Sequence, residues 1–126
     1  MQTILVAEDD AVMHRALAEL FELEGYEVIG ARSLHDAVIF LGDRVINGAV
    51  VDWRLGADFS DVILIQLIDL GVATVLLSAH PEARHVADSY GIPCVHKPFN
   101  VEQLIGILSG AMQRTTLRKI KIAPRG

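Results

Sequence analysis

Four apolar residues lead directly into three carboxylates in the stretch Ile4-Leu5-Val6-Ala7-Glu8-Asp9-Asp10. The apolar run predicts a strand of a parallel sheet that is buried on both faces. Asp10 is expected to cap the following helix, because an aspartate accepts hydrogen bonds from free N–H groups of a first turn. Glu8 and Asp9 then remain at the carboxyl end of the strand, where open α/β sheets bind ligands. Either solvent or a hard cation such as Mg²⁺ would relieve their mutual repulsion.

The rest of the chain alternates between helical periodicity and short apolar runs. Further strands are expected at residues 26–29, 49–52, 72–77 and 92–95, and a very apolar helix at residues 58–70. Ser33 and Asn100 are expected to cap two other helices. Five strands alternating with five helices predict an α/β fold with one parallel sheet and right-handed crossovers. The strand order 2-1-3-4-5 would place the first and third strands side by side.

Length, composition and charge narrow the class of protein. The 126 residues suit one domain, about half of them are apolar, and no apolar run is long enough to span a bilayer. The start of the chain lacks a basic signal-peptide region, and the single cysteine, Cys94, fits a reducing compartment. A cytoplasmic location is therefore expected.

Charge divides the chain into two parts. Residues 1–113 carry 16 acidic and 6 basic residues, a formal charge of −10, whereas no acid follows Glu102. An acidic body of this kind repels nucleic acid, so direct DNA binding is not expected. Residues 114–126 form a basic tail, for which both an extension of the last helix and a disordered end stay open.

The ends of the predicted strands bring a second set of polar residues to the acidic pair. Asp52 follows Val50-Val51, Ser78 follows Leu76-Leu77, and Lys97 precedes Pro98 after the fifth strand. Because parallel strands end at one edge of a sheet, we expect these side chains to converge with Glu8 and Asp9.

These residues, in this order, resemble the receiver domain of two-component response regulators over residues 2 to about 113. The resemblance implies a flavodoxin-like three-layer sandwich, and it implies Mg²⁺ bound by Glu8, Asp9, Asp52 and the backbone carbonyl of Arg54. It also implies that Asp52 accepts a phosphoryl group from a sensor histidine kinase or a histidine phosphotransfer protein. Ser78 and Lys97 would contact that group, and the Lys97-Pro98 bond would be cis.

Two positions depart from the pattern of the family. The loop of residues 53–58 lacks the proline that often follows the phosphoacceptor, and Cys94 stands where many members carry an aromatic switch residue. Arg54 and His80 occupy positions that influence the lifetime of the phosphoryl group in the family. Trp53, beside Asp52, is interpreted as a half-exposed aromatic packed against the loop.

The resemblance implies a stand-alone phosphoacceptor switch that catalyses only its own phosphorylation and dephosphorylation. Its output would be a contact with an unidentified downstream protein, and no membrane partner is expected. Whether the chain forms a homodimer stays open. The alternative is a Mg²⁺-dependent phosphatase or phosphotransferase acting on small molecules. Such enzymes usually place a second acid two residues after the nucleophile, where this chain has Arg54, which cannot donate a proton. A flavin- or nucleotide-binding module would need a Gly/Ser/Thr-rich phosphate loop after the first strand, where Glu8 and Asp9 would repel a phosphate.

Overall fold

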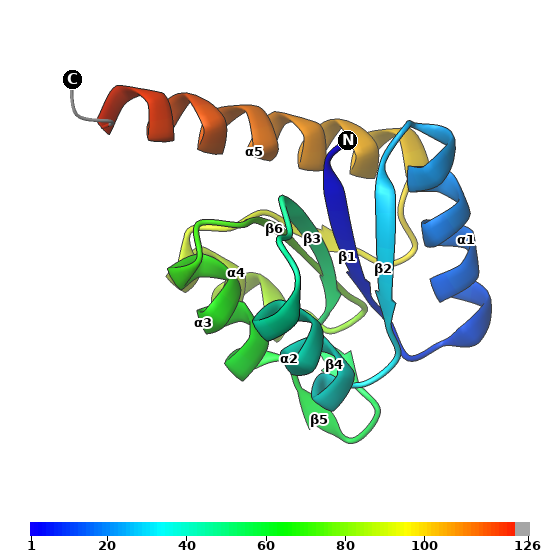
Figure 1. Ribbon diagram of the computed structural model, residues 1–126. Helices are drawn as coiled ribbons and strands as arrows, with labels where there is room; N and C mark the ends of the chain where they lie inside the picture. The colour runs from blue at the N-terminus through cyan, green and yellow to red at the C-terminus, as the bar shows by residue number, and fades with distance from the viewer. Residues whose placement is uncertain (123–126) are drawn as a thin grey trace.

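The computed structural model describes the backbone of residues 1–122 and the side chains of residues 1–118 (Figure 1). Its elements are β1 Thr3–Ala7, α1 Ala11–Leu23, β2 Glu27–Ala31, α2 Leu34–Asp43, β3 Gly48–Asp52, β4 Arg54–Leu55, β5 Asp58–Phe59, α3 Asp61–Asp69, β6 Ala73–Ser78, α4 Glu82–Tyr90, β7 Cys94–His96 and α5 Val101–Ile122. Five strands form one parallel sheet in the order β2-β1-β3-β6-β7, and β4 and β5 form a separate antiparallel hairpin. Counted over its five strands, the sheet has the predicted order 2-1-3-4-5, so the predicted fold is confirmed.

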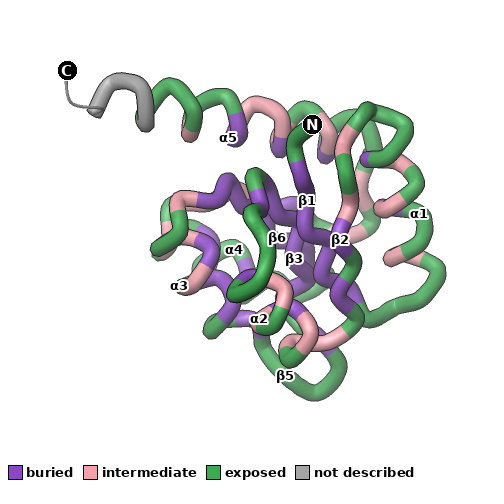
Figure 2. The backbone as a smooth tube through the Cα atoms, viewed as in Figure 1, coloured by how far each residue is buried: buried purple, intermediate pink, exposed green. Residues whose placement is uncertain are grey.

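Helices cover both faces of the sheet and make three layers. In Figure 1, α1 and α5 lie on one face, and α2, α3 and α4 lie on the other. Each face has its own apolar core, with Phe21 and Leu104 in one core and Leu64 and Ala87 in the other. Every residue of β1 and β3 is buried, as Figure 2 shows. The two-sided burial explains why these strands are apolar runs without alternation.

Three helices begin at polar residues that were predicted to cap them. The side chains of Asp10, Ser33 and Asn100 each accept a hydrogen bond from the backbone N–H three residues later, at 2.9, 3.1 and 3.1 Å. Caps of this kind are worth about 1 kcal/mol each. Because Asp10 is engaged in capping α1, Glu8 and Asp9 are left in the loop at the end of β1.

The segment after Asp52 differs from the predicted helix at residues 58–70. Asp58 belongs to the short β5, and α3 begins only at Asp61. Ser60 donates two hydrogen bonds to the Trp53 carbonyl, from its N–H at 3.0 Å and its hydroxyl at 3.1 Å, which closes the hairpin before the helix starts. Gly56 provides the left-handed turn with a φ of 65°. The predicted start of the third helix was therefore three residues too early.

The last helix continues past residue 113, where the receiver domain was expected to end. α5 runs to Ile122, and the side chains of Arg114, Leu117 and Arg118 are exposed. The division into a domain of residues 1–113 and a basic tail of residues 114–126 stays a prediction, and residues 123–126 lie outside the described residues. In the described part of the chain no helix, α5 included, combines the length and the apolar character needed to cross a membrane.

Candidate functional site

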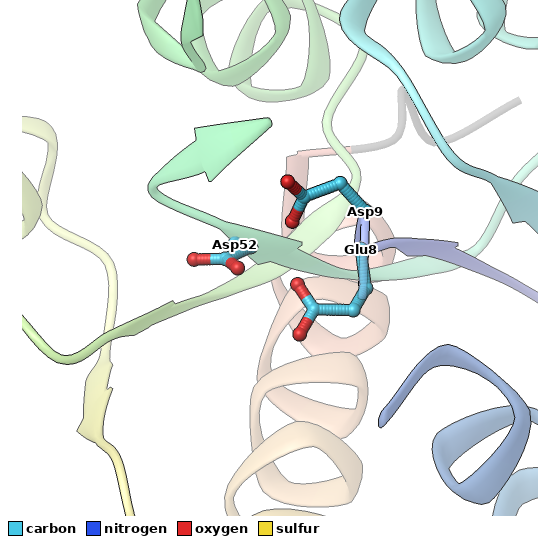
Figure 3. Close-up of side chains that lie close together, drawn as sticks. All are labelled: Glu8, Asp9 and Asp52. Carbon is cyan, nitrogen blue, oxygen red and sulfur yellow. The ribbon is translucent and has the colours of Figure 1, made fainter. Parts of the chain in front are cut away.

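Three carboxylates meet at the carboxyl edge of the sheet. Glu8 and Asp9 follow β1, Asp52 ends β3, and β1 and β3 are paired neighbours. One carboxylate oxygen from each of these residues lies within 4.8 Å of the others. Figure 3 shows the three side chains turned toward one another from two adjacent strand ends. The convergence expected from the strand order is thus present in the structure.

Burial makes this cluster costly in the absence of a counter-charge. The side chain of Glu8 is only 1% exposed and that of Asp52 is 12% exposed. Burial of Glu8, together with its neighbour Asp52, raises the pKa of the Glu8 carboxyl to about 8. Within the described part of the chain, Oε2 of Glu8 is buried and has no hydrogen-bond partner. An unpaired buried carboxylate oxygen beside two further carboxylates fits a hard divalent cation, which prefers oxygen ligands.

Lys97 supplies the one ammonium in contact with the described cluster. Its Nζ donates hydrogen bonds to Oδ2 of Asp52 at 2.9 Å and to Oε1 of Glu8 at 3.0 Å. Burial opposes the charged form of Lys97, but the hydrogen bonds to Asp52 and Glu8 outweigh it and raise the pKa of the ammonium. The Lys97-Pro98 peptide bond is cis, as the resemblance implied. A charged lysine is therefore fixed against the candidate phosphoacceptor.

The position of Asp9 depends on two residues that the sequence did not single out. The backbone N–H of Gly56, at the turn of the β4–β5 hairpin, donates a 2.9 Å hydrogen bond to Oδ2 of Asp9. The guanidinium of Arg32, after β2, donates to the Asp9 carbonyl at 3.1 and 3.3 Å. An Asn- or Gly-type turn signal at Gly56 could have located the first contact, whereas no sequence pattern pointed to Arg32.

Ser78 ends β6 on the same edge, and its hydroxyl is engaged within its own loop. The Oγ atom accepts a 2.8 Å hydrogen bond from the His80 N–H and donates one of 3.3 Å to the His80 carbonyl. The residue is fully buried, and its carbonyl accepts a hydrogen bond from the Lys97 N–H at 2.9 Å. Ser78 and Lys97 are therefore adjacent through the backbone, and no described hydrogen bond joins the Ser78 hydroxyl to Asp52.

Arg54 contacts the site through its backbone. Its N–H donates a 3.4 Å hydrogen bond to Oδ1 of Asp52, so the two oxygens of Asp52 have different donors. The guanidinium of Arg54 lies over the ring of Phe59, 5.2 Å from the ring centre. The role of the Arg54 carbonyl as a metal ligand stays a prediction.

The interpretation of Trp53 as half-exposed was wrong. Trp53 is only 5% exposed, and its ring packs against that of Phe59 with 5.1 Å between the centroids. The hairpin, which was not predicted, places Phe59 over the indole and removes it from solvent. Trp53 thus belongs to the core directly beneath the loop that follows Asp52.

Cys94 lies on β7 as a half-buried free thiol. It packs at the edge of the core on the α4 side of the sheet, where Tyr90 and Val86 are also partly buried. Burial raises the pKa of this thiol. A small side chain thus occupies the position at which the resemblance implied that many receiver domains carry an aromatic switch residue.

Comparison with known proteins gives relatives that are named as transcriptional regulatory proteins, although no family model matches the chain. The chain is 25% identical over 125 residues to the phosphate regulon transcriptional regulatory protein PhoB of Pseudomonas aeruginosa, covering 90% of this chain and 53% of PhoB. It is 28% identical over 116 residues to the transcriptional regulatory protein PdtaR of Mycobacterium tuberculosis, covering 88% and 57%. The chain therefore spans about half the length of the curated relatives it matches.

Solved structures share the fold over nearly the whole chain. A CheY-like response regulator receiver domain from Methanospirillum hungatei superposes with a TM-score of 0.86 at 20% identity, covering 94% of this chain and 98% of that one. A response regulator from Burkholderia pseudomallei, solved with a phosphorylated aspartic acid, a calcium ion and citrate, gives 0.79 at 24% identity, covering 98% and 76%. The fold is that of response regulator receiver domains. The resemblance to response regulator receiver domains that the sequence predicted is thereby confirmed.

Proposed function

We propose that this chain is a phosphoacceptor switch in which Asp52 receives a phosphoryl group from a histidine kinase or a histidine phosphotransfer protein. The observation that carries the proposal is the contact set of Asp52. One of its oxygens faces the Lys97 ammonium at 2.9 Å, and the carboxylates of Glu8 and Asp9 lie within 4.8 Å. A nearly buried carboxylate with a fixed cation and a cation-binding acid pair has the parts that phosphoryl transfer requires.

The transfer is a displacement at phosphorus. A carboxylate oxygen of Asp52 forms the new P–O bond, while the P–N bond of the donor phosphohistidine breaks and its electron pair returns to the imidazole nitrogen. The product on the chain is an acyl phosphate. Lys97 is a compact cation positioned to pair with an oxygen of the transferred group. Ser78, at the neighbouring strand end, is proposed to donate its hydroxyl to another phosphoryl oxygen.

The proposed metal ligands are the side chains of Glu8, Asp9 and Asp52 and the carbonyl of Arg54. The unpartnered Oε2 of Glu8 and the close approach of the three carboxylates support this set. Bound Mg²⁺ would supply positive charge against the carboxylates and the incoming phosphoryl group. The Gly56 N–H positions the carboxylate of Asp9, and the Arg32 guanidinium positions its backbone carbonyl.

The output and the location belong to the same proposal. We propose a cytoplasmic protein that signals through contact with a downstream protein. The alternative, a Mg²⁺-dependent phosphatase or phosphotransferase for small molecules, is less well supported. Arg54 stands where such an enzyme needs a proton donor, and its guanidinium lies over Phe59.

The proposal is tested by incubating the protein with Mg²⁺ and acetyl phosphate and measuring its intact mass. The expected result is a single phosphoryl adduct that requires Mg²⁺ and that hydroxylamine removes, as it removes acyl phosphates. Multiple turnover of acetyl phosphate without a retained adduct would instead favour the small-molecule enzyme. No adduct and no turnover would contradict both functions.

A further inference from the structure

The outer side of α3 and of the hairpin before it carries exposed apolar residues. Phe59 is 48% exposed, Val62 52% and Ile65 46%, and their spacing of three residues places the helical pair on one side of α3. Buried positions of the same helix, such as Ile63 and Leu64, point into the core instead. We call the surface formed by Phe59, Val62 and Ile65, together with the neighbouring acids Asp58, Asp61 and Asp69, the α3 face.

Three exposed carboxylates border these apolar residues. Asp58, Asp61 and Asp69 are all exposed, and none of them forms an ion pair with any residue whose side chain the structure describes. Asp61 and Asp69 are eight residues apart, so about 12 Å of helix separates them. A partner of the α3 face therefore needs an apolar side chain with cationic side chains near it.

The end of α5 has this chemistry. Leu117 is 58% exposed and lies between the exposed residues Arg114 and Arg118. Neither arginine is ion-paired in the described part of the chain, and no acidic residue follows Glu102 in the sequence. The end of α5 is the basic part of a chain whose first 113 residues are strongly acidic.

The two surfaces do not meet within one molecule. α3 and α5 pack on opposite faces of the sheet (Figure 1). Leu117 borders a groove with Gln2 and Tyr26, beside the starts of β1 and β2. The α3 face and the end of α5 have opposite charge and exposed apolar side chains. They can therefore meet between two molecules but not within one.

We propose that the α3 face of one molecule binds the end of α5 of a second copy of this chain. Leu117 packs against Val62 and Ile65, and the two arginines pair with Asp61 and Asp69. Two such contacts related by a two-fold axis would close a dimer, whereas single contacts would extend into longer assemblies. The association needs neither Mg²⁺ nor a phosphoryl group, so it is independent of the proposed function.

Exposed ion pairs contribute little each and are screened by salt, so the association is expected to weaken as ionic strength rises. Sedimentation velocity of the metal-free, unphosphorylated full chain over a wide concentration range measures it directly. Two charge-reversed variants separate the surfaces: Asp61→Lys/Asp69→Lys on the α3 face and Arg114→Glu/Arg118→Glu on α5. Circular dichroism checks that each variant keeps its fold.

Each charge-reversed variant alone is expected to self-associate at least tenfold more weakly than the wild type, because like charges then face each other. An equimolar mixture of the two is expected to associate again, since both contacts between unlike molecules are complementary. Glu19→Lys/Glu22→Lys, on the exposed side of α1, should associate as the wild type does. Ile65→Ser should weaken association without any change in charge.

Two results would overturn the proposal. One is a wild-type chain that stays monomeric at every concentration, which would mean that a second copy of the chain does not bind the α3 face. The other is a mixture of the two charge-reversed variants that associates no better than either variant alone.

Discussion

The Lys97 ammonium donates a 2.9 Å hydrogen bond to Oδ2 of Asp52, across the carboxyl edge of the sheet. The same Nζ also contacts Glu8, at 3.0 Å. One lysine therefore holds together two nearly buried carboxylates that come from β1 and β3. This contact links the stability of the site to its proposed chemistry.

Replacing Lys97 with alanine should destabilise the protein. The change leaves the carboxylates of Glu8 and Asp52 without their common cation, and breaking a partly buried pair of this kind costs on the order of 2 kcal/mol. Urea unfolding without metal measures the loss. Arg44→Ala, which removes the exposed 2.7 Å ion pair with Glu27, is the matched control and should change stability by less than about 1 kcal/mol. Equal effects of the two changes would mean that the lysine is merely another surface charge.

Magnesium should change the fluorescence of Trp53. Trp53 directly follows Asp52, and its buried indole packs against Phe59 of the hairpin. The N–H of Gly56, in the same hairpin, donates a hydrogen bond to Asp9. A cation at the carboxylates is therefore expected to alter the surroundings of the indole. Titration of Mg²⁺ with fluorescence and calorimetry tests this, and chelation should reverse the change. A silent fluorescence signal together with no heat of binding would rule out the proposed metal site.

The thiol of Cys94 should react slowly in the folded protein. Burial raises its pKa, with Arg84 lowering it in part and Asp88 adding to the rise. The pKa of the thiol is therefore higher in the folded chain than in the unfolded chain. The neutral thiol contributes fully to stability below the unfolded pKa, and this contribution is lost as pH rises through the folded pKa. At about pH 8–9, alkylation by iodoacetamide should be several-fold slower in the folded chain than in urea. Because Cys94 is the single cysteine, intact mass reports this site alone, and equal rates would contradict the buried environment.

The response to phosphorylation should depend on Ser78 and not on Cys94. If the Ser78 hydroxyl donates its hydrogen to a phosphoryl oxygen, it must release the hydrogen bond that it donates to the His80 carbonyl, and the loop after β6 is expected to shift. The Cys94 side chain is too small to act as an aromatic switch. Amide exchange of the complex with Mg²⁺ and beryllofluoride should change over residues 78–85 in the wild type and in Cys94→Ala, but not in Ser78→Ala. The reverse pattern for the two variants would refute this mechanism.

The sequence predicted the features that follow from burial and from strand ends. Apolar runs without alternation indicated parallel strands, and polar residues directly after Val6-Ala7, Val51 and Leu77 indicated the edge at which they would meet. Both signals are local along the chain, and the topology then determines which residues become neighbours.

The hairpin after Asp52 was not predicted, because its two strands have only two residues each and show no periodicity. Its formation depends on the Ser60 contacts with the Trp53 carbonyl, which join positions seven residues apart. The same hairpin buries Trp53 and places Gly56 against Asp9. Because the hairpin was not predicted, neither the burial of Trp53 nor the Gly56 contact was predicted. The contact of Arg32 with Asp9 spans 23 residues and depends on the pairing of β1 with β2.

Labelling of the Asp52→Asn variant decides whether Asp52 is the phosphoacceptor. The amide is nearly isosteric with the carboxylate but is a poor nucleophile, so the fold should persist. Asp58→Asn, an exposed acid six residues later, is the matched control. With Mg²⁺ and acetyl phosphate, we expect one phosphoryl adduct by intact mass in the wild type and in Asp58→Asn, and none in Asp52→Asn. Labelling of Asp52→Asn at the wild-type rate would contradict this expectation, because the acceptor would then be another residue.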